Sequence, residues 1–250
     1  PPPVPDAKPV TPAREPRVMA NGLPRTATPS AIWVPDTWEP DTNLRIQALG
    51  SLIRTDAPRV IPILKEIALQ SPDPNEASRA VFVLAQSGLA DAHLTVLEVA
   101  RRGSESVQIA AVRELGRFGG PKVTDQLLEV YSDGNPRVKY QILNSLGERA
   151  ATSALLRIAE KESDKRLQET AIVRLGQAGA REQLQRLYAR SSAELKRPII
   201  IGLFNARADE ELIRIADQER DEAVRREVML RLRLLGTARA RAYLEKQQPK

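Results

Sequence analysis

The 250-residue sequence contains no cysteine and a single histidine, His93, and only 4% of its residues are aromatic. The absence of cysteine excludes disulfides, thiol nucleophiles and cysteine-ligated metals. One histidine excludes a metal site that needs two imidazole ligands. No run of 18 apolar residues occurs, so the sequence predicts no membrane-spanning helix. With 42% apolar residues, the chain still has enough apolar side chains to form a folded core.

Sequence motifs for common enzymes are missing as well. The sequence contains no GxGxxG, GxxxxGK, GxSxG or HExxH pattern. We interpret His93 as a surface or hydrogen-bonded histidine, and the acidic run Asp209, Glu210 and Glu211 as the first turn of a helix. We therefore expect a protein that is not an enzyme, with no catalytic residue, no cofactor and no metal.

Proline divides the chain into two parts. Residues 1–40 hold 11 of the 19 prolines, which predicts an extended tail with polyproline II character over 1–40. The end of this tail, about 31–40, includes Trp33 and Trp38 and is expected to cap the first unit of the domain that follows, over 41–246. The alternative is that Trp33 and Trp38 contact a partner.

The sequence begins at Pro1, without an initiator methionine. We interpret it as a processed or shortened product, and a proline-rich start without cysteine favours an extracytoplasmic location over a cytoplasmic one.

A repeat of about 30 residues fills the second part of the chain. It is marked by leucines spaced 28–32 residues apart, at Leu52, Leu84, Leu115, Leu146, Leu175, Leu203 and Leu232. In six of the seven units an aliphatic residue stands eight residues before the leucine. The exception is Glu76, which predicts a late start for the first helix of its unit. Three residues earlier again stands a residue that favours the helix N-cap, at Asp41, Asp73, Ser104, Asn135, Asp164, Ser192 and Asp221.

Each unit has the features of a helical hairpin. Glycine, the residue that most easily ends a helix in the left-handed conformation, follows four residues after the leucine in four units, at Gly88, Gly119, Gly179 and Gly236. Asp56, Ala150 and Arg207 occupy this position in the other three, so we expect those helices to end differently. A second apolar run then follows in every unit. The fold class is therefore predicted to be all-α, with about seven helix–turn–helix repeats stacked into a right-handed α-solenoid.

The segments VQIAAVRELGRFGG and ETAIVRLGQAGA carry a family resemblance. They resemble the first helix and turn of HEAT-like repeats, in particular the short bacterial type of phycobilisome lyase-like proteins. The resemblance covers about 41–246. It implies an armadillo-like superhelix in which the second helices line a concave face that binds a protein or peptide.

Charge suggests the kind of partner. The net charge is +6, and residues 220–250 hold nine basic and four acidic residues. This distribution fits a solvated polar cap on the last repeat, or contact of that end with an acidic protein, peptide or lipid. It does not favour nucleic acid, which needs basic residues along a whole groove. The candidate partner-binding residues are Arg225, Arg226, Arg231, Arg233, Arg239 and Arg241 with Tyr131, Tyr188, Tyr243, Trp33 and Trp38. A nucleic-acid-binding or base-excision module and a bilin lyase-like protein remain alternatives, and a monomer is expected.

Overall fold

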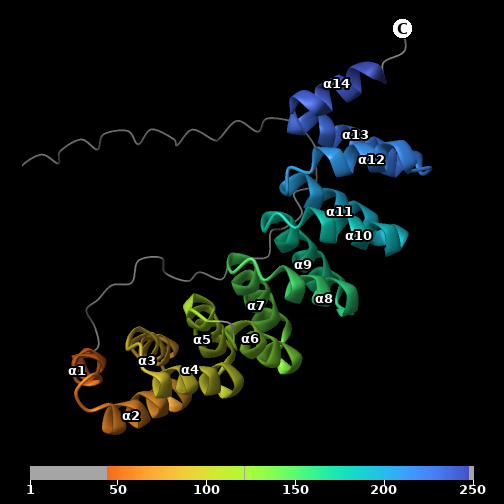
Figure 1. Cartoon of the computed structure of the whole chain (residues 1–250). Helices are drawn as coiled ribbons and strands as arrows, with labels where there is room; N and C mark the ends of the chain where they lie inside the picture. Colours follow the sequence, from red (N-terminus) through yellow and green to blue (C-terminus); the bar gives the residue numbers. More distant parts are fainter. Residues whose placement is uncertain (1–43, 121, 248–250) are drawn as a thin grey trace, which may run out of the picture. The chain divides into compact units, whose positions relative to one another are not determined.

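The computed structural model describes residues 44–120 and 122–247, which form α-helices and short connections (Figure 1). The predicted tail over 1–40, with Trp33 and Trp38, lies outside the described residues, as does Asp41. The fourteen helices of the described part are α1 (Leu44–Leu52), α2 (Ala57–Gln70), α3 (Pro74–Gln86), α4 (Ala90–Arg102), α5 (Glu105–Arg117), α6 (Lys122–Asp133), α7 (Pro136–Glu148), α8 (Thr152–Lys161), α9 (Lys165–Gln177), α10 (Arg181–Arg190), α11 (Ala193–Asn205), α12 (Asp209–Gln218), α13 (Glu222–Leu235) and α14 (Ala238–Lys246).

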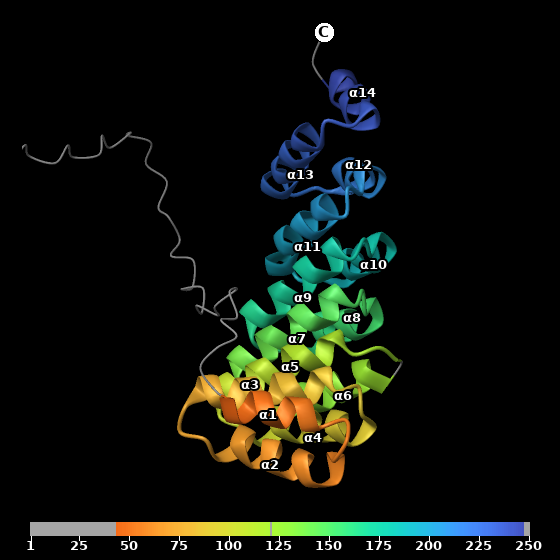
Figure 2. The ribbon, with the colours of Figure 1, turned by 90° about the vertical axis from the view of Figure 1, so that its left-hand side faces the viewer.

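The helices are arranged in two layers. Each odd-numbered helix packs against the even-numbered helix that follows it and against the next odd-numbered helix (Figures 1 and 2). The core is one continuous cluster of aliphatic and alanine side chains between the layers, from Ile46 to Ala240. The all-α repeat architecture predicted from the sequence is confirmed. None of the described helices is long and apolar enough to cross a membrane.

The first helix of each unit begins where the sequence predicts. Asp73, Asn135, Asp164 and Asp221 each accept a hydrogen bond from a backbone N–H of the first turn that follows, which satisfies a donor that the helix itself leaves unpaired. Ser104 and Ser192 also occupy N-cap positions, although their side chains make no such bond. In the unit with Glu76 the expected late start is wrong. Helix α3 begins at Pro74, directly after its cap, because Ala77, 1% exposed, takes the buried position.

The repeat leucines form the buried seam in six units and not in the first. Leu84, Leu115, Leu146, Leu175, Leu203 and Leu232 are all 0% exposed. Leu52, by contrast, is 52% exposed, and its neighbour Ile53 is buried. Helix α1 is short and ends at Leu52, and the buried residues of this segment are Ile46 and Ile53, two residues after Leu44 and one after Leu52. The assignment of Leu52 to the seam is therefore wrong.

The helix ends are more uniform than the glycine pattern suggests. Gly88, Gly179 and Gly236 have positive φ, as expected. Ala150 (φ 49°) and Arg207 (φ 53°) adopt the same left-handed conformation without being glycine. The residue after each donates its N–H to a carbonyl five residues back, at Leu146 and Leu203, just as Ala180 donates to Leu175 after Gly179. The expectation that these two helices end differently is wrong, because the hydrogen-bonded turn outweighs the cost of placing a Cβ there. In the third unit the left-handed residue is Gly120 and not Gly119.

Small residues let consecutive odd-numbered helices approach closely. A Cβ at Gly116 would lie 2.7 Å from the Cβ of Ser145, and a Cβ at Gly176 would lie 2.8 Å from the Cα of Gly202. Figure 1 shows that the row of described helices bends toward the odd-numbered layer, which therefore lies on the inner side of the bend. The resemblance implied that the second helices line the concave face; in this chain the first helices do.

Candidate binding surface

The described residues offer few groups for chemistry. They contain no cluster of three or more histidine, aspartate or glutamate side chains that could hold a metal ion. His93 is half-buried, lies 2.9 Å from the Gln126 side-chain oxygen through its Nε2, and packs edge-on against Phe118. Asp209 accepts a hydrogen bond from Thr237 and pairs with Arg239, so its role is to connect α12 to α14.

The predicted tyrosines lie in the even-numbered layer, and each hydroxyl donates to a carboxylate. Tyr131, 8% exposed on α6, donates to Glu162 at 2.5 Å. Tyr188 on α10 donates to Glu219, and Tyr243 on α14 donates to Asp217 at 2.6 Å. The depression between α6 and α8, about 360 Å³, is bordered by Tyr131 and Glu162, which already satisfy each other. These rings connect neighbouring repeats.

One arrangement, in which a tyrosine hydroxyl and a lysine ammonium share one glutamate, occurs twice in the stack, first with Tyr131, Lys139 and Glu162. In the second copy, the Lys196 ammonium lies 2.7 Å from Glu219 and 5.5 Å from the centre of the Tyr188 ring. The other oxygen of Glu219 accepts from the backbone N–H groups of Arg220 and Asp221, directly before α13. Burial raises the pKa of Glu219. The hydrogen bonds from Lys196, Tyr188 and the backbone lower the pKa by more than burial raises it, so that the pKa of Glu219 is about 2. Burial of the Tyr188 hydroxyl, its hydrogen bond to Glu219 and the negative charge of Glu219 together hold the pKa of Tyr188 above its usual range.

We expect Glu219→Gln to cost more stability at pH 7 than at pH 3. A carboxylate whose pKa falls on folding contributes stability that is complete above its unfolded pKa of about 4.5 and is lost as the pH falls toward 2. Urea unfolding of wild type and variant at both pH values measures the difference. Glu160→Gln, which removes an exposed glutamate from α8, is the control for loss of a surface charge. An equal cost at the two pH values would contradict a pH-dependent contribution of Glu219.

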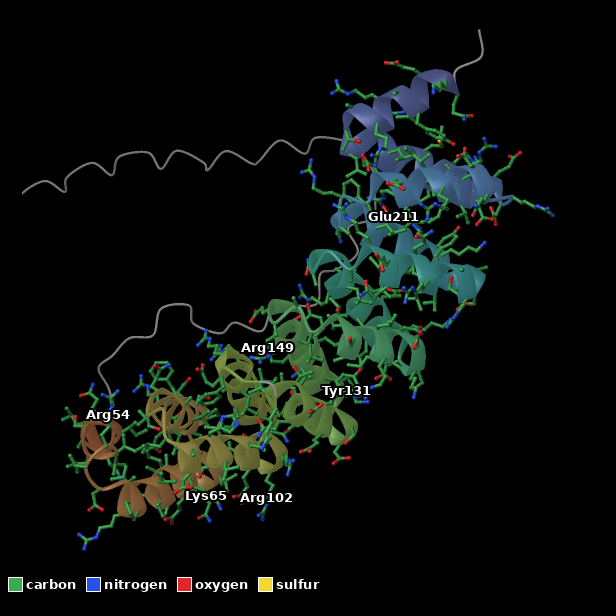
Figure 3. All side chains as sticks on the ribbon, viewed as in Figure 1. Arg54, Lys65, Arg102, Tyr131, Arg149 and Glu211 are labelled. Carbon is green, nitrogen blue, oxygen red and sulfur yellow. The ribbon has the colours of Figure 1, made fainter. Side chains whose placement is uncertain are left out.

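The outer side of the even-numbered layer is nearly neutral. Figure 3 shows Lys65 and Arg102 along this side, where both pair with Glu98, at 2.6 and 3.2 Å. Arg239 pairs in the same layer with Asp209 and Glu210. The seven even-numbered helices together contain 14 basic and 13 acidic side chains.

The odd-numbered layer carries the basic excess of the fold. Its seven helices have 15 basic and 8 acidic side chains, and α9, α11 and α13 alone have 9 and 4. We call the side of these helices that faces away from the even-numbered layer the odd-layer surface. In a helix, a residue two positions before or after a buried leucine lies about 200° round the axis, so it faces this surface.

A polar groove crosses the odd-layer surface between α5, α7 and α9. Its volume is about 420 Å³, and it is lined by Arg113, Arg117, Gln141, Asn144, Gly147, Glu148, Arg174 and Gln177. The Arg174 guanidinium donates twice to the Asn144 amide oxygen, at 2.6 and 3.1 Å, and once to Gln177 at 2.6 Å. Neutral amides are weaker partners for arginine than a carboxylate. The groove thus holds a guanidinium in a fixed orientation with its charge uncompensated by either amide.

The predicted arginines are divided between roles. Arg225, Arg226, Arg231 and Arg233 all lie on α13, while Arg239 and Arg241 lie on α14. Arg231 pairs with Glu227 at 2.7 Å and lies 5.4 Å from the Phe204 ring, so it is a packing residue. Arg225, Arg226, Arg233 and Arg241 are exposed and contact no carboxylate in the described part of the chain.

Sequence reasoning missed the groove arginines Arg113 and Arg174. Their positions, two residues and one residue before a seam leucine, could have indicated that they lie on the odd-layer surface. They were not considered because the resemblance assigned the concave face to the other helix of each repeat. The inner side of the bend, which decides which helices form the groove, depends on distances between helices and was not visible in the spacing.

The sequence pattern of HEAT repeats matches the chain twice, over residues 65–147 and 94–172. These matches begin within α2 and end within α9, so they include the groove residues of α5 and α7, while Arg174 and Gln177 follow just after their end. No curated protein matches the chain.

Proposed function

Since residues 65–172 are HEAT repeats, we propose that the chain is a non-catalytic scaffold that binds a protein segment on its odd-layer surface. The observation that carries the proposal is the excess of seven basic side chains on the odd-numbered helices, against one on the even-numbered helices. Two of the basic side chains on the odd-numbered helices, Lys139 and Lys196, pair with Glu162 and Glu219 in the connections, which leaves an excess of five. An interface is steered and oriented by such a difference in charge between two faces. The groove with Arg174 supplies a fixed guanidinium for a carboxylate of the partner.

The test gives Arg174 an internal carboxylate that competes with the partner. The double variant Asn144→Asp and Gln177→Glu changes neutral amides that already contact Arg174 into acids of nearly the same shape. It is therefore expected to fold normally while it neutralises the groove. The control variant, Gln70→Glu with Gln218→Glu, makes the same change of charge at exposed amides on α2 and α12.

Each variant is used to capture proteins from the source cells, with quantification against wild type. We expect the recovered amount of proteins that wild type captures to fall at least tenfold with the groove variant and to stay unchanged with the control variant. Capture that is equal for all three proteins, or no specific capture by wild type, would contradict binding at the odd-layer surface. Circular dichroism of each variant shows that the helices are intact.

A further inference from the structure

The odd-layer surface changes character along the stack. Residues two positions before the seam leucines are polar on α5 and α7, where Arg113 and Asn144 stand. On α9, α11 and α13 the same position holds Val173, Ile201 and Leu230. Together with Leu234, two residues after the last seam leucine, these three form what we call the apolar row.

The apolar row faces away from the core. Leu230 is 46% and Leu234 59% exposed, and they adjoin each other on one helix face, where a group of exposed aliphatic side chains is informative although a single exposed leucine is not. Val173 and Ile201 are partly exposed and do not belong to the side chains packed against the core. Their position about 200° from the buried leucines explains this, because the seam occupies the opposite side of each helix.

Arginines flank the row on α11 and α13. Arg197 and Arg226 stand six residues before the seam leucines, one turn from the apolar row. Both are exposed, and neither contacts a carboxylate in the part of the chain that the structure describes. On α9 the equivalent residue is Glu169, so the basic flank begins at α11.

From this combination we infer that α9, α11 and α13 dock a segment of a partner protein that carries aliphatic side chains flanked by aspartate or glutamate. Aliphatic side chains of the segment cover Val173, Ile201 and Leu230, and its carboxylates pair with Arg197 and Arg226. Packed helices are about 8–10 Å apart, and a segment in the polyproline II conformation, with three residues per turn, advances about 9 Å in three residues. A segment of this conformation that crosses the three helices therefore places every third side chain on the row.

Nucleic acid matches this surface less well. A nucleic acid needs basic groups along its backbone path, and the apolar row of Val173, Ile201, Leu230 and Leu234 contains none. Removing the exposed leucines from water instead stabilises a complex with an apolar partner. This inference rests on the proposed function and assigns it a partner chemistry.

The experiment selects peptides from a random display library on the full chain and then measures their affinities. We expect enrichment of aliphatic residues together with aspartate or glutamate. Synthetic copies of the selected peptides should bind at least tenfold more weakly to the variant Arg197→Glu with Arg226→Glu, and also to Ile201→Gln with Leu230→Gln. The control Arg157→Glu with Arg190→Glu makes the same charge change on α8 and α10 and should leave the affinity unchanged.

Several outcomes would overturn the inference. They are selection of peptides without acidic residues, affinities that both variants leave unchanged, and equal losses with the control. Tighter binding of a labelled single-stranded 20-nucleotide DNA than of any selected peptide, lost with Arg197→Glu and Arg226→Glu, would assign the surface to nucleic acid. If peptides of another composition are selected and lost only with the groove variant, the proposed function stands and this partner chemistry fails.

Discussion

Leu115→Ala is expected to lower the free energy of unfolding by about 2–5 kcal/mol. Leu115 is 0% exposed on α5 and belongs to the continuous core between the layers. Truncation removes apolar contacts on both sides and leaves a cavity that the neighbouring helices fill only in part. Urea unfolding followed by circular dichroism measures the change.

Leu52→Ala is the matched control, because the sequence pattern places both leucines in the same register. The structure leaves Leu52 52% exposed at the end of α1. A surface truncation changes stability by about 0.5 kcal/mol or less. Equal losses for Leu52 and Leu115 would restore the sequence register and contradict the shift to Ile53.

The buried seam was predictable because it depends on local pattern. A leucine every 28–32 residues, with a capping residue eleven positions before it, defines both where a helix begins and which side of it is buried. The buried residues of the first unit were not predicted correctly because its helix is short and its cap lies outside the described residues. The left-handed helix ends at Ala150 and Arg207 were not predicted for another reason. Backbone hydrogen bonds in the turn, and not the residue type, fix their left-handed conformation.

The candidate site was predictable only in part. Basic charge near the C-terminal end of the sequence indicated α13, and binding there stays a prediction; within this helix Arg231 is already occupied by Glu227 and Phe204. The tyrosines were visible in the sequence, whereas their carboxylate partners stand 26–31 residues away, in the neighbouring repeat. Pairing across repeats requires knowledge of how far each repeat is rotated on the next, and spacing alone does not give that rotation.

The direction of the bend has a physical cause in the glycines of the odd-numbered helices. Gly116, Gly147 and Gly176 each follow a seam leucine directly, and each faces the next odd-numbered helix. Without a side chain at this position the odd-numbered helices approach one another more closely. A layer with shorter spacing than its partner layer becomes the inner side of the stack. The glycine column thus brings Arg174 and the apolar row to the inner side, where a partner contacts several repeats at once.

Gly176→Ala is therefore expected to destabilise the fold by about 1–3 kcal/mol or more, the range for overpacking a close contact. The added methyl group would lie 2.8 Å from both the Cα and the carbonyl carbon of Gly202. Those are backbone atoms, which cannot turn aside as a flexible side chain does, so α9 and α11 must separate. Urea unfolding measures the loss. Binding of the selected peptides, which cross both helices, should weaken in parallel.

Gly119→Ala is the control for this change. No atom lies within 4 Å of a Cβ built at Gly119, and its φ is not positive, so the same methyl group meets neither a neighbour nor backbone strain there. We expect its stability to stay within about 0.5 kcal/mol of wild type. If Gly176→Ala were equally harmless, the two odd-numbered helices would not be in backbone contact. The glycine column would then not explain why the odd-numbered layer lies on the inner side of the bend.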